Sequence, residues 1–388
     1  MDVDISKLSA GGVVTVDLGA LVDNYRSVGR LAAGSRCAAV VKADAYGLGM
    51  RPVSRALFDA GCDAFFVATV AEGRELRDEL SQAAIYVLEG PGGFDAVAAL
   101  RAANLVPVLN SIEQVRIWSN PVRPAACVLH LDTGMSRLGL APEEVGQLTA
   151  SDSLLRGLQI EYVMTHLACA DEPDNPANDE QLRLFDSLRS ALPAAATSIG
   201  NSAGIQLGSR FCGDLVRPGI ALYGGSPVRG STSPFREVVG LYGRVLQLRT
   251  ISRSTPVGYG AAHTAHPPAR LATLGLGYAD GYPRSLGGRG FAVVAGTRVP
   301  VVGAVSMDSV VIDVTAVAPD AIRVDDAVQL LGGGIGLAEV AGLAGTIDYE
   351  ILTGLSRRLS RRYHGMQSET GPVVGVTGFE PATSTSRR

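Results

Sequence analysis

Eight short apolar segments recur through the first 224 of the 388 residues, and helical patterns separate most of them. Thr69 and Glu72 have the spacing of a capping box at the start of one such helix, and Ser111 and Gln114 repeat it. Strands that alternate with helices over this length predict a (β/α)8 TIM-like barrel, with a doubly wound open sheet as the alternative. The predicted strands are Ala38–Val41, Ala64–Ala68, Ala84–Leu88, Val106–Leu109, Ala126–Leu131, Ile160–Thr165, Ala196–Ile199 and Leu215–Tyr223.

The pattern changes near Val238, where strand-like segments separated by Gly, Pro and Asp replace the alternation of strands and helices. Apolar and polar residues alternate in Leu246–Arg249, as in a strand with one buried face. We therefore expect a mainly β C-terminal domain, with helices only near its end, at Leu337–Gly345 and Tyr349–Ser360.

The boundary between the two domains is expected near Gly224–Phe235, a segment rich in Gly, Ser and Pro. This places the barrel at 1–237 and the β domain at 238–370, and leaves open whether the N-terminal strand joins the second domain. Residues 371–388 lack periodicity and are predicted to be disordered.

The composition excludes several classes of protein. Hydrophobic residues make up 46% of the chain, and a net charge of -4 without a basic stripe argues against nucleic-acid binding. No apolar signal segment begins the chain, and the charge-free run Ser190–Ser209 contains Pro193 and is a poor membrane span. Five widely spaced cysteines without a CxxC pair predict reduced thiols and no metal site. We expect a cytoplasmic protein.

A lysine ends the first predicted strand, in the segment VVKADAYGLGM. Active sites of such barrels lie at the C-terminal ends of the strands, where Lys42 falls. A lysine there can form a Schiff base with a carbonyl substrate or with pyridoxal phosphate. Tyr46 adds a hydroxyl group, and Gly47 and Gly49 permit close approach of the backbone.

Further candidate residues lie at or after the ends of the later predicted strands, or within the eighth. Each has an ordinary structural explanation, such as an ion pair of Arg137 with Asp132, but together with Lys42 they indicate one functional rim. They are Arg137, His166, Ser202, Arg217, Gly219 and Ile220.

Eight sequence blocks, in order, resemble the alanine racemase family. The blocks are VVKADAYGLG, LDTGMSRLG, NSAG, VRPGIALYG, VGYGAAHTA, GYADGYPR, VSMD and TIDYE. The resemblance runs from about Val13 to Arg362 and implies a barrel that binds pyridoxal phosphate, a β domain, and a head-to-tail homodimer with shared active sites. It also implies interconversion of L-alanine and D-alanine, supplying D-alanine for cell-wall peptidoglycan.

The resemblance also assigns roles around the cofactor. Lys42 would hold pyridoxal phosphate covalently and, once displaced by the substrate amine, act as a base. His166 would pack beside the pyridine ring, and Arg137 would lie near the phenolic oxygen and the substrate. The phosphate would be bound by Tyr46, Ser202 and Tyr349 and by the backbone amides of Gly219 and Ile220.

Arg217 would face the pyridine nitrogen. A unit charge about 4 Å away, at an effective dielectric constant of 20, costs roughly 4 kcal/mol, or about three pKa units against ring protonation. The ring then delocalises a carbanion less fully, which favours return of a proton to Cα over transamination.

Racemisation needs a proton donor on each face of the planar intermediate, and two tyrosines compete for the face opposite Lys42. The resemblance assigns Tyr259, reaching the neighbouring subunit's cofactor, as the catalytic residue. Tyr278 would line the entrance. Met307 would offer its backbone amide to the substrate carboxylate, while Asp308 would hold that loop.

One position departs from the family. Where the family commonly has a carbamylated lysine that orients the arginine of the DTGM block, this chain has His130. An imidazole does not form the same stable carbamate, so we expect retained activity with less dependence on CO2.

Three alternative functions can be weighed against this interpretation. A fold-related basic amino-acid decarboxylase should carry a glycine-rich phosphate loop and an acid opposite the pyridine nitrogen, and neither is found. A non-catalytic carrier of pyridoxal phosphate would leave the second half of the chain unexplained. A racemase of serine, or of a broader amino-acid set, stays open.

Overall fold

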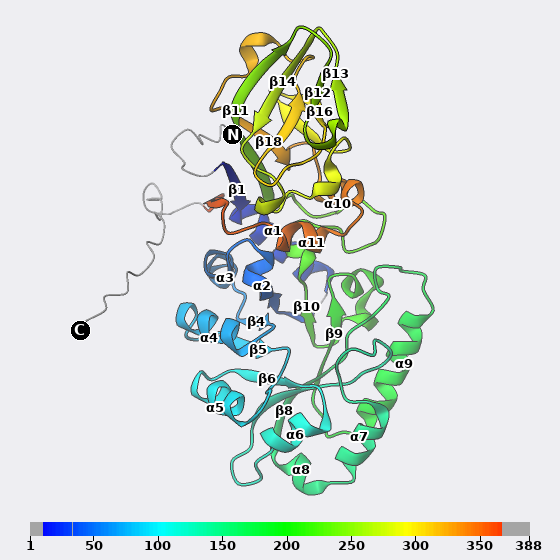
Figure 1. The fold of residues 1–388 in the computed structure, drawn as a ribbon. Coiled ribbons are helices and arrows are strands. Elements are labelled where there is room, and N and C mark those ends of the chain that lie inside the picture. The colour runs from blue at the N-terminus through cyan, green and yellow to red at the C-terminus, as the bar shows by residue number, and fades with distance from the viewer. Residues whose placement is uncertain (1–10, 33, 367–388) are drawn as a thin grey trace, which may run out of the picture.

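The computed structural model describes residues 11–32 and 34–366 as a barrel with a β domain above it (Figure 1). The predicted disordered segment 371–388 lies outside the described residues. The barrel sheet is parallel, and its strands follow the order β2-β10-β9-β8-β7-β6-β5-β4-β3. Its strands are β2 (Arg36–Cys37), β3 (Ala39–Val40), β4 (Ala64–Val67), β5 (Ala84–Val87), β6 (Val106–Leu109), β7 (Ala125–His130), β8 (Leu158–Met164), β9 (Ala196–Asn201) and β10 (Leu215–Arg217).

The nine strand segments form eight barrel strands, because β2 and β3 are two parts of one strand divided at Ala38. The first part pairs with β10 and the second with β4. At the division, the amide of Ala38 donates to the carbonyl of Val216 at 2.9 Å. The sheet therefore closes on itself, which confirms the predicted barrel and excludes the open sheet.

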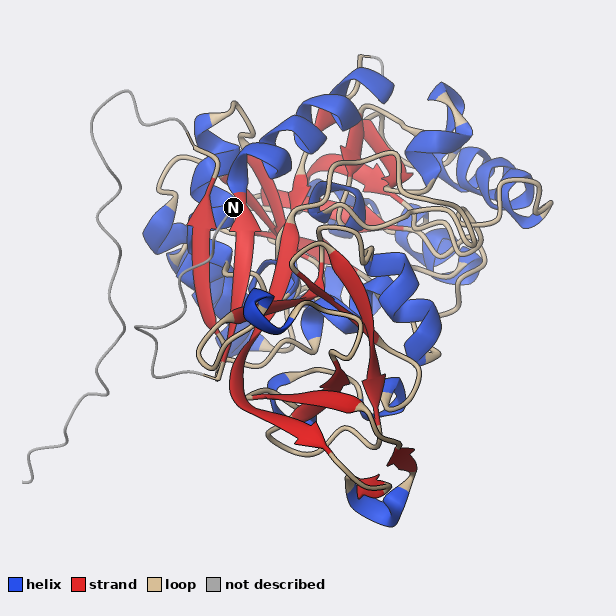
Figure 2. Cartoon of the chain, turned by 90° about the horizontal axis from the view of Figure 1, so that it is seen from above, coloured by secondary structure: helices blue, strands red, loops and turns tan. Residues whose placement is uncertain are grey.

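Helices surround this barrel, as the view from above shows (Figure 2). The predicted capping box is confirmed at α4, where Thr69 and Glu72 each accept from the other's backbone amide. Ser111 caps α6 in the same position. The helices are α1 (Leu18–Leu31), α3 (Met50–Asp59), α4 (Val70–Glu79), α5 (Phe94–Ala102), α6 (Ile112–Trp118), α7 (Pro142–Thr149), α8 (Asp152–Arg156) and α9 (Ala177–Ser190).

The predicted eighth strand is too long. Strand β10 ends at Arg217, and Ile220–Tyr223 forms a 3-10 helix instead. Pro218 has no N–H to continue the ladder, and Gly219 leaves extended geometry with ψ of -88°. The chain therefore turns at the barrel rim rather than running past it.

The second sheet confirms the mainly β C-terminal domain. Its order is β14-β17-β16-β15-β18-β11-β1-β19. The N-terminal strand lies inside it, antiparallel to β11 and parallel to β19. Its strands are β1 (Gly12–Asp17), β11 (Val239–Ile251), β14 (Ala269–Leu274), β15 (Phe291–Val294), β16 (Thr297–Val302), β17 (Val310–Asp313), β18 (Ala327–Leu331) and β19 (Ser360–His364), with a separate hairpin of β12 (Thr255–Val257) and β13 (His263–Ala265).

Among the described residues of this domain, two segments form α-helices, α10 (Leu337–Ala344) and α11 (Asp348–Thr353). The helix predicted over Tyr349–Ser360 is thus wrong beyond Thr353. Gly354 caps α11, and the chain soon enters β19, where pairing with β1 overrides the local helical pattern.

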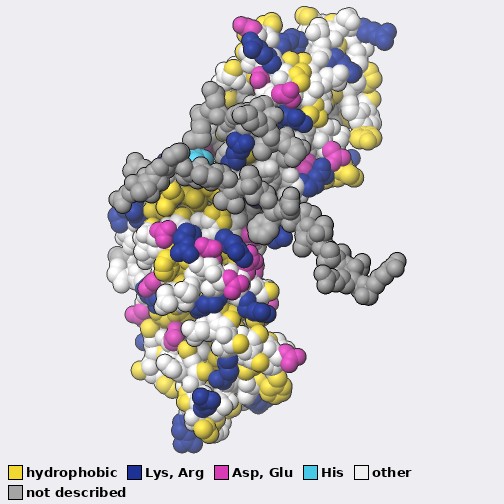
Figure 3. Space-filling model, turned by 90° about the vertical axis from the view of Figure 1, so that its left-hand side faces the viewer, with side chains coloured by type: hydrophobic (Ala, Val, Ile, Leu, Met, Phe, Trp, Pro, Cys, Tyr) yellow, Lys and Arg dark blue, Asp and Glu magenta, His cyan; other side chains and the backbone are white. Residues whose placement is uncertain are grey.

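The surface carries mixed charge. Lys and Arg side chains are interspersed with Asp and Glu over the face in Figure 3. Within residues 11–32 and 34–366, no helix combines the length and apolar character needed to cross a membrane.

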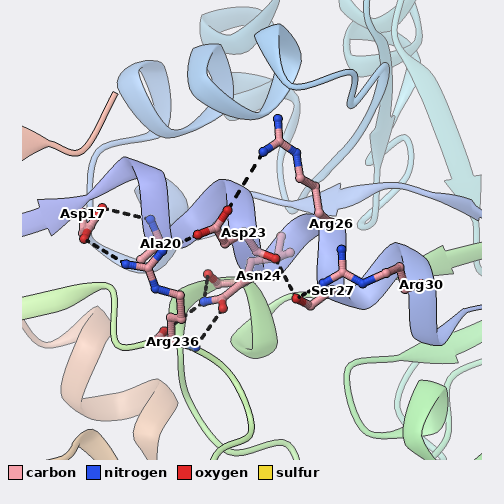
Figure 4. A network of polar contacts seen from close by, with 9 residues as sticks. Asp17, Ala20, Asp23, Asn24, Arg26, Ser27, Arg30 and Arg236 are labelled. Atoms are coloured by element: carbon pink, nitrogen blue, oxygen red, sulfur yellow. Dashed lines mark hydrogen bonds and ion pairs between the residues drawn. The ribbon is translucent and has the colours of Figure 1, made fainter. Parts of the chain in front are cut away.

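A buried asparagine ties α1 to the segment that leads out of the barrel (Figure 4). The amide nitrogen of Asn24 donates to the carbonyls of Leu222 at 3.2 Å and Arg236 at 2.9 Å. Its oxygen accepts from the Arg236 amide at 2.8 Å. One side chain therefore fixes the connection between the two domains.

We predict that Asn24→Ala destabilises the protein by about 1–3 kcal/mol, because it leaves buried backbone groups without partners. Denaturant unfolding measures the change. Arg26→Ala is the matched control on the same helix, since its exposed ion pair with Asp23 spans 4.0 Å. The control should change stability by less than about 0.5 kcal/mol. Equal effects of the two substitutions would contradict the assigned role of Asn24.

Candidate active site

Lys42 stands at the end of the first barrel strand and begins a left-handed turn, α2 (Lys42–Tyr46). Four non-glycine residues in succession, Ala43 to Tyr46, have φ between 52° and 57°. Each such residue costs roughly 1–2 kcal/mol relative to ordinary backbone geometry. A turn of this kind persists only where surrounding contacts hold it.

The half-buried amine of Lys42 has a lowered pKa. Burial is the main cause, and the positive charge of Arg137 adds to it, while Glu72 and Glu89 oppose it. A lower pKa increases the fraction of free amine, which is the form that attacks a carbonyl group and accepts a proton. Lys42 is therefore suited to both tasks.

A cluster of hydroxyl groups lies beside the turn. Ser202 accepts hydrogen bonds from the amides of Gly219 at 2.9 Å and Ala221 at 3.3 Å. The Tyr46 ring lies 5.9 Å from that of Tyr349. The Cβ of any larger residue at position 219 would lie 2.1 Å from the Tyr46 hydroxyl oxygen, so only glycine fits. Tyr46, Ser202, Gly219 and Tyr349, all predicted from the sequence, are thus neighbours.

Arg217 is buried at the end of β10 and donates to three oxygen atoms. These are Ser198 Oγ at 2.6 Å, the Thr165 carbonyl at 2.8 Å and the Ile199 carbonyl at 3.3 Å. Burial lowers the pKa of Arg217 to about 10, which still leaves the guanidinium charged near neutral pH.

His166 lies against this charge, with Nδ1 3.4 Å from a guanidinium nitrogen of Arg217. An arginine can only donate, so Nδ1 is the acceptor and the proton of the neutral ring is on Nε2. Burial, followed by the charges of Arg217 and Arg137, holds the pKa of His166 well below its usual range. His166 is therefore a neutral side chain at this rim.

His130, at the end of β7, is also neutral. Its Nδ1 lies 2.8 Å from Oδ1 of Asn110. The amide nitrogen of Asn110 donates to the carbonyls of Leu88 and Val108, so Oδ1 must accept a hydrogen bond from the Nδ1–H of His130. Burial, then the charge of Arg217, lowers the pKa of His130 to about 3. Nε2 is left with a free lone pair.

Arg137 is exposed in the loop after β7. The ion pair with Asp132 considered from the sequence is not formed, because Asp132 instead accepts from the amides of Gly134, Met135 and Ser136. Arg137 makes no ion pair with any described residue. Its charge nevertheless contributes to the lowered pKa values of Lys42 and His166.

Three predicted residues lie apart from this rim, on the β domain. The side chains of Tyr259, Tyr278 and Met307 are 75%, 42% and 53% exposed. The loops of Tyr278 and Met307 are joined, since the amides of Tyr278 and Ala279 donate to the carbonyls of Ser306 and Met307 at 3.0 Å each. Arg358 pairs with Asp308 of this same surface at 2.7 Å.

Sequence reasoning missed the residues that support Lys42 and His130. Glu72 was recognised only as a helix cap, yet its carboxylate also accepts from the amide of Ala43 at 2.7 Å. Asn110 and Arg361 carried no recognisable motif. Asn110 bonds to backbone carbonyls and to His130, which is 20 residues away, and Arg361 bonds to backbone carbonyls only. Such contacts leave no pattern in the sequence.

These residues fit a phosphorylated aldehyde coenzyme. Lys42 offers an amine of lowered pKa, and the absence of a side chain at Gly219 lets the Tyr46 hydroxyl approach the backbone amides there. Hydroxyls and backbone amides suit a phosphate dianion. A neutral imidazole and a buried guanidinium complete the rim.

Comparisons with known families agree with this arrangement. Residues 16–227 match the family model "Alanine racemase, N-terminal domain", and residues 238–363 match "Alanine racemase, C-terminal domain". The catabolic alanine racemase of Agrobacterium fabrum is 47% identical, over 97% of this chain and 99% of that protein. The alanine racemase of Rhodospirillum rubrum is also 47% identical, over 93% and 98%.

Solved structures are similar over the same length. Alanine racemase from Bartonella henselae with covalently bound pyridoxal phosphate has a TM-score of 0.86 and 37% identity, covering 92% of this chain and 100% of that one. The biosynthetic alanine racemase from Pseudomonas aeruginosa has a TM-score of 0.85 and 35% identity, covering 92% and 99%.

The lowered pKa of His130 predicts a pH-dependent stability. Below about pH 6.5 an unfolded histidine takes up a proton that the folded one does not, so stability falls as the pH decreases. His130→Gln removes this effect and should reduce the loss of unfolding free energy between pH 7 and pH 5 by about 2 kcal/mol. Denaturant unfolding at both pH values measures it, with His266→Gln as the exposed control. A variant that loses as much stability as the wild type would refute the argument.

Proposed function

This chain belongs to the alanine racemase family, and we propose that it works by two-base proton transfer, with Lys42 on one face of the substrate and Tyr259 on the other. The activity is the interconversion of L-alanine and D-alanine, an isomerisation, and the cofactor is pyridoxal phosphate. The observation that carries the proposal is the lowered pKa of Lys42 next to a cluster of hydroxyl groups and backbone amides. We call this cluster, formed by Tyr46, Ser202, Gly219 and Tyr349, the hydroxyl cradle.

The residues of the barrel rim have distinct tasks in this proposal. When bound, pyridoxal phosphate draws electron density from the substrate Cα and makes its proton acidic. Lys42 holds the cofactor and moves a proton at Nζ. Tyr46, Ser202 and Tyr349, with the amides of Gly219 and Ile220, bind the phosphate group.

Arg217 places a fixed positive charge opposite the pyridine nitrogen. Its protons are committed to Ser198, Thr165 and Ile199, so the guanidinium cannot turn away. Next to it, His166 packs on the cofactor as a neutral ring. Arg137 and the backbone amide of Met307 would bind the substrate carboxylate, and Arg137 would also face the phenolic oxygen of the cofactor.

Tyr259 acts from the neighbouring subunit of a head-to-tail homodimer. The 75% exposure of this side chain, together with the exposed Tyr278 and Met307, supports a surface that is completed by a second copy. We propose that His166, which is held by Arg217, lowers the pKa of the Tyr259 hydroxyl from its ordinary value near 10 through a hydrogen bond.

The direction of the reaction in the cell is a separate question. The similar protein of Agrobacterium fabrum is named as catabolic, and that of Pseudomonas aeruginosa as biosynthetic. We propose supply of D-alanine for peptidoglycan in the cytoplasm, with D-alanine breakdown as the second candidate. The division into 1–237 and 238–370 is likewise proposed, with β1 assigned to the sheet of the second domain.

Solvent deuterium tests the reaction. In heavy water, the purified protein should incorporate deuterium at Cα of both alanine enantiomers and scramble either pure enantiomer, because each face has its own proton donor. Mass spectrometry after chiral separation measures this. Lys42→Ala should abolish incorporation. The same assay with L- and D-serine tests for a broader substrate range. Absence of deuterium in either alanine enantiomer would overturn the proposal.

A second test distinguishes the roles of Tyr259 and Tyr278. Tyr259→Phe should lower kcat by about 10²–10⁴-fold, because it removes a proton donor while leaving the barrel rim and cofactor binding intact. Tyr278→Phe is the matched control and should have a much smaller effect. Steady-state racemisation and cofactor absorbance measure both. The reverse order of effects would assign the catalytic role to Tyr278.

A further inference from the structure

The left-handed turn that carries Lys42 is held at both ends by side chains from elsewhere in the chain. At its start, the Glu72 carboxylate accepts from the amides of Ala43 at 2.7 Å, Ala68 at 2.7 Å and Thr69 at 3.2 Å. Glu72 therefore fixes the turn relative to the next barrel strand. The unusual backbone still requires a second restraint at its end.

That restraint comes from Arg361 of β19, in the other domain. Its Nε and one terminal nitrogen both donate to the carbonyl of Gly47, at 3.1 and 2.9 Å. Its other three N–H groups donate to the carbonyls of Leu355, Ser356 and Leu359, at 2.8, 2.8 and 2.9 Å. All five N–H groups of the guanidinium are used, and none meets a carboxylate.

Tyr363, two residues further along β19, adds a contact beside it. Its hydroxyl donates to the carbonyl of Leu48 at 2.9 Å. The packing is tight, because a Cβ at Gly49 would lie 2.1 Å from this hydroxyl and one at Gly47 would lie 2.6 Å from the Leu352 carbonyl. Arg361 and Tyr363 thus form a clamp on the end of the turn.

The clamp also reaches other parts of the proposed site. The carbonyls of Leu355, Ser356 and Leu359 belong to the segment that follows α11, the helix carrying Tyr349. In the same segment, Arg358 pairs with Asp280 and Asp308. The Arg361 guanidinium therefore joins the turn of Lys42 to the segment that follows the helix of Tyr349.

We propose that Arg361 is a positioning residue for Lys42, acting through the Gly47 carbonyl to keep the left-handed turn in place. The inference rests on the proposed role of Lys42 in the racemase reaction. Lysine is a poor substitute, because it lacks the planar fork that reaches Gly47 and the 355–359 carbonyls together.

The test compares Arg361→Gln with Arg362→Gln in the purified full-length protein with its cofactor. Arg362 is the matched control, since it is the next residue of the same strand and its side chain is exposed. Hydrogen exchange at residues 43–47 reports on the turn, with strand β7 as an internal reference. Steady-state kinetics report on its effect on catalysis.

Arg361→Gln should speed exchange in the turn but not in β7. It should lower kcat by about 10–100-fold with little change in KM, as expected for a displaced catalytic group. Arg361→Lys should recover only part of kcat, and Arg362→Gln should resemble the wild type. An Arg361→Gln protein with normal exchange and normal kcat overturns the inference, as does faster exchange throughout the protein with unchanged kcat.

A second variant decides the matter if Arg361→Gln does not fold. Tyr363→Phe removes only one hydroxyl group and should shift exchange and kcat in the same direction by a smaller factor, and no shift in either overturns the inference. The exchange measurement does not depend on the reaction. A wild-type protein without racemase activity would therefore refute the proposed function while leaving the effect of Arg361 on the turn decidable.

Discussion

Closure of the barrel brings the two ends of its sequence together. The amide of Val40, two residues before Lys42, donates to the carbonyl of Pro218 at 3.0 Å. The hydroxyl of Tyr223 then returns to the Val40 carbonyl at 2.8 Å. Residues almost 180 positions apart thereby share one rim, which brings the segment that begins with Lys42 next to the segment that contains Gly219. Without the pairing between the first and the last barrel strands, Lys42 and the hydroxyl groups near Gly219 would not lie at the same rim.

Charge within that rim is set by one buried arginine. The side chain of Arg217 is held by oxygen atoms from β8 and β9 and their ends, so its position is as fixed as the barrel itself. After burial, its charge is the largest cause of the low pKa values of His166 and His130. Both imidazoles are therefore neutral and add no positive charge to that of the arginines. Such a charge would oppose protonation of a pyridine nitrogen bound beside it, as the proposed function requires.

Sequence patterns predicted the barrel, the β domain and most of the residues at the rim, because each leaves a local trace. Apolar segments mark the strands, Lys42 follows the end of the first, and Arg217 and Gly219 lie in the segment predicted as the eighth. The long eighth strand was wrong because Pro218 breaks the ladder. Support for Lys42 could not be predicted, because Arg361 binds only backbone carbonyls, which every residue carries. The acceptor of His130 likewise lies 20 residues away, on the preceding strand's end.

The position of β1 makes the two domains inseparable as contiguous pieces. This first strand is sandwiched between β11 and β19, although the whole barrel follows it in the chain. A fragment starting at residue 238 would lack an inner strand and expose the unpaired edges of its neighbours, a template for aggregation. On the ribosome, β1 emerges before the barrel yet must wait for β19, so this sheet is completed only after the whole barrel has been synthesised.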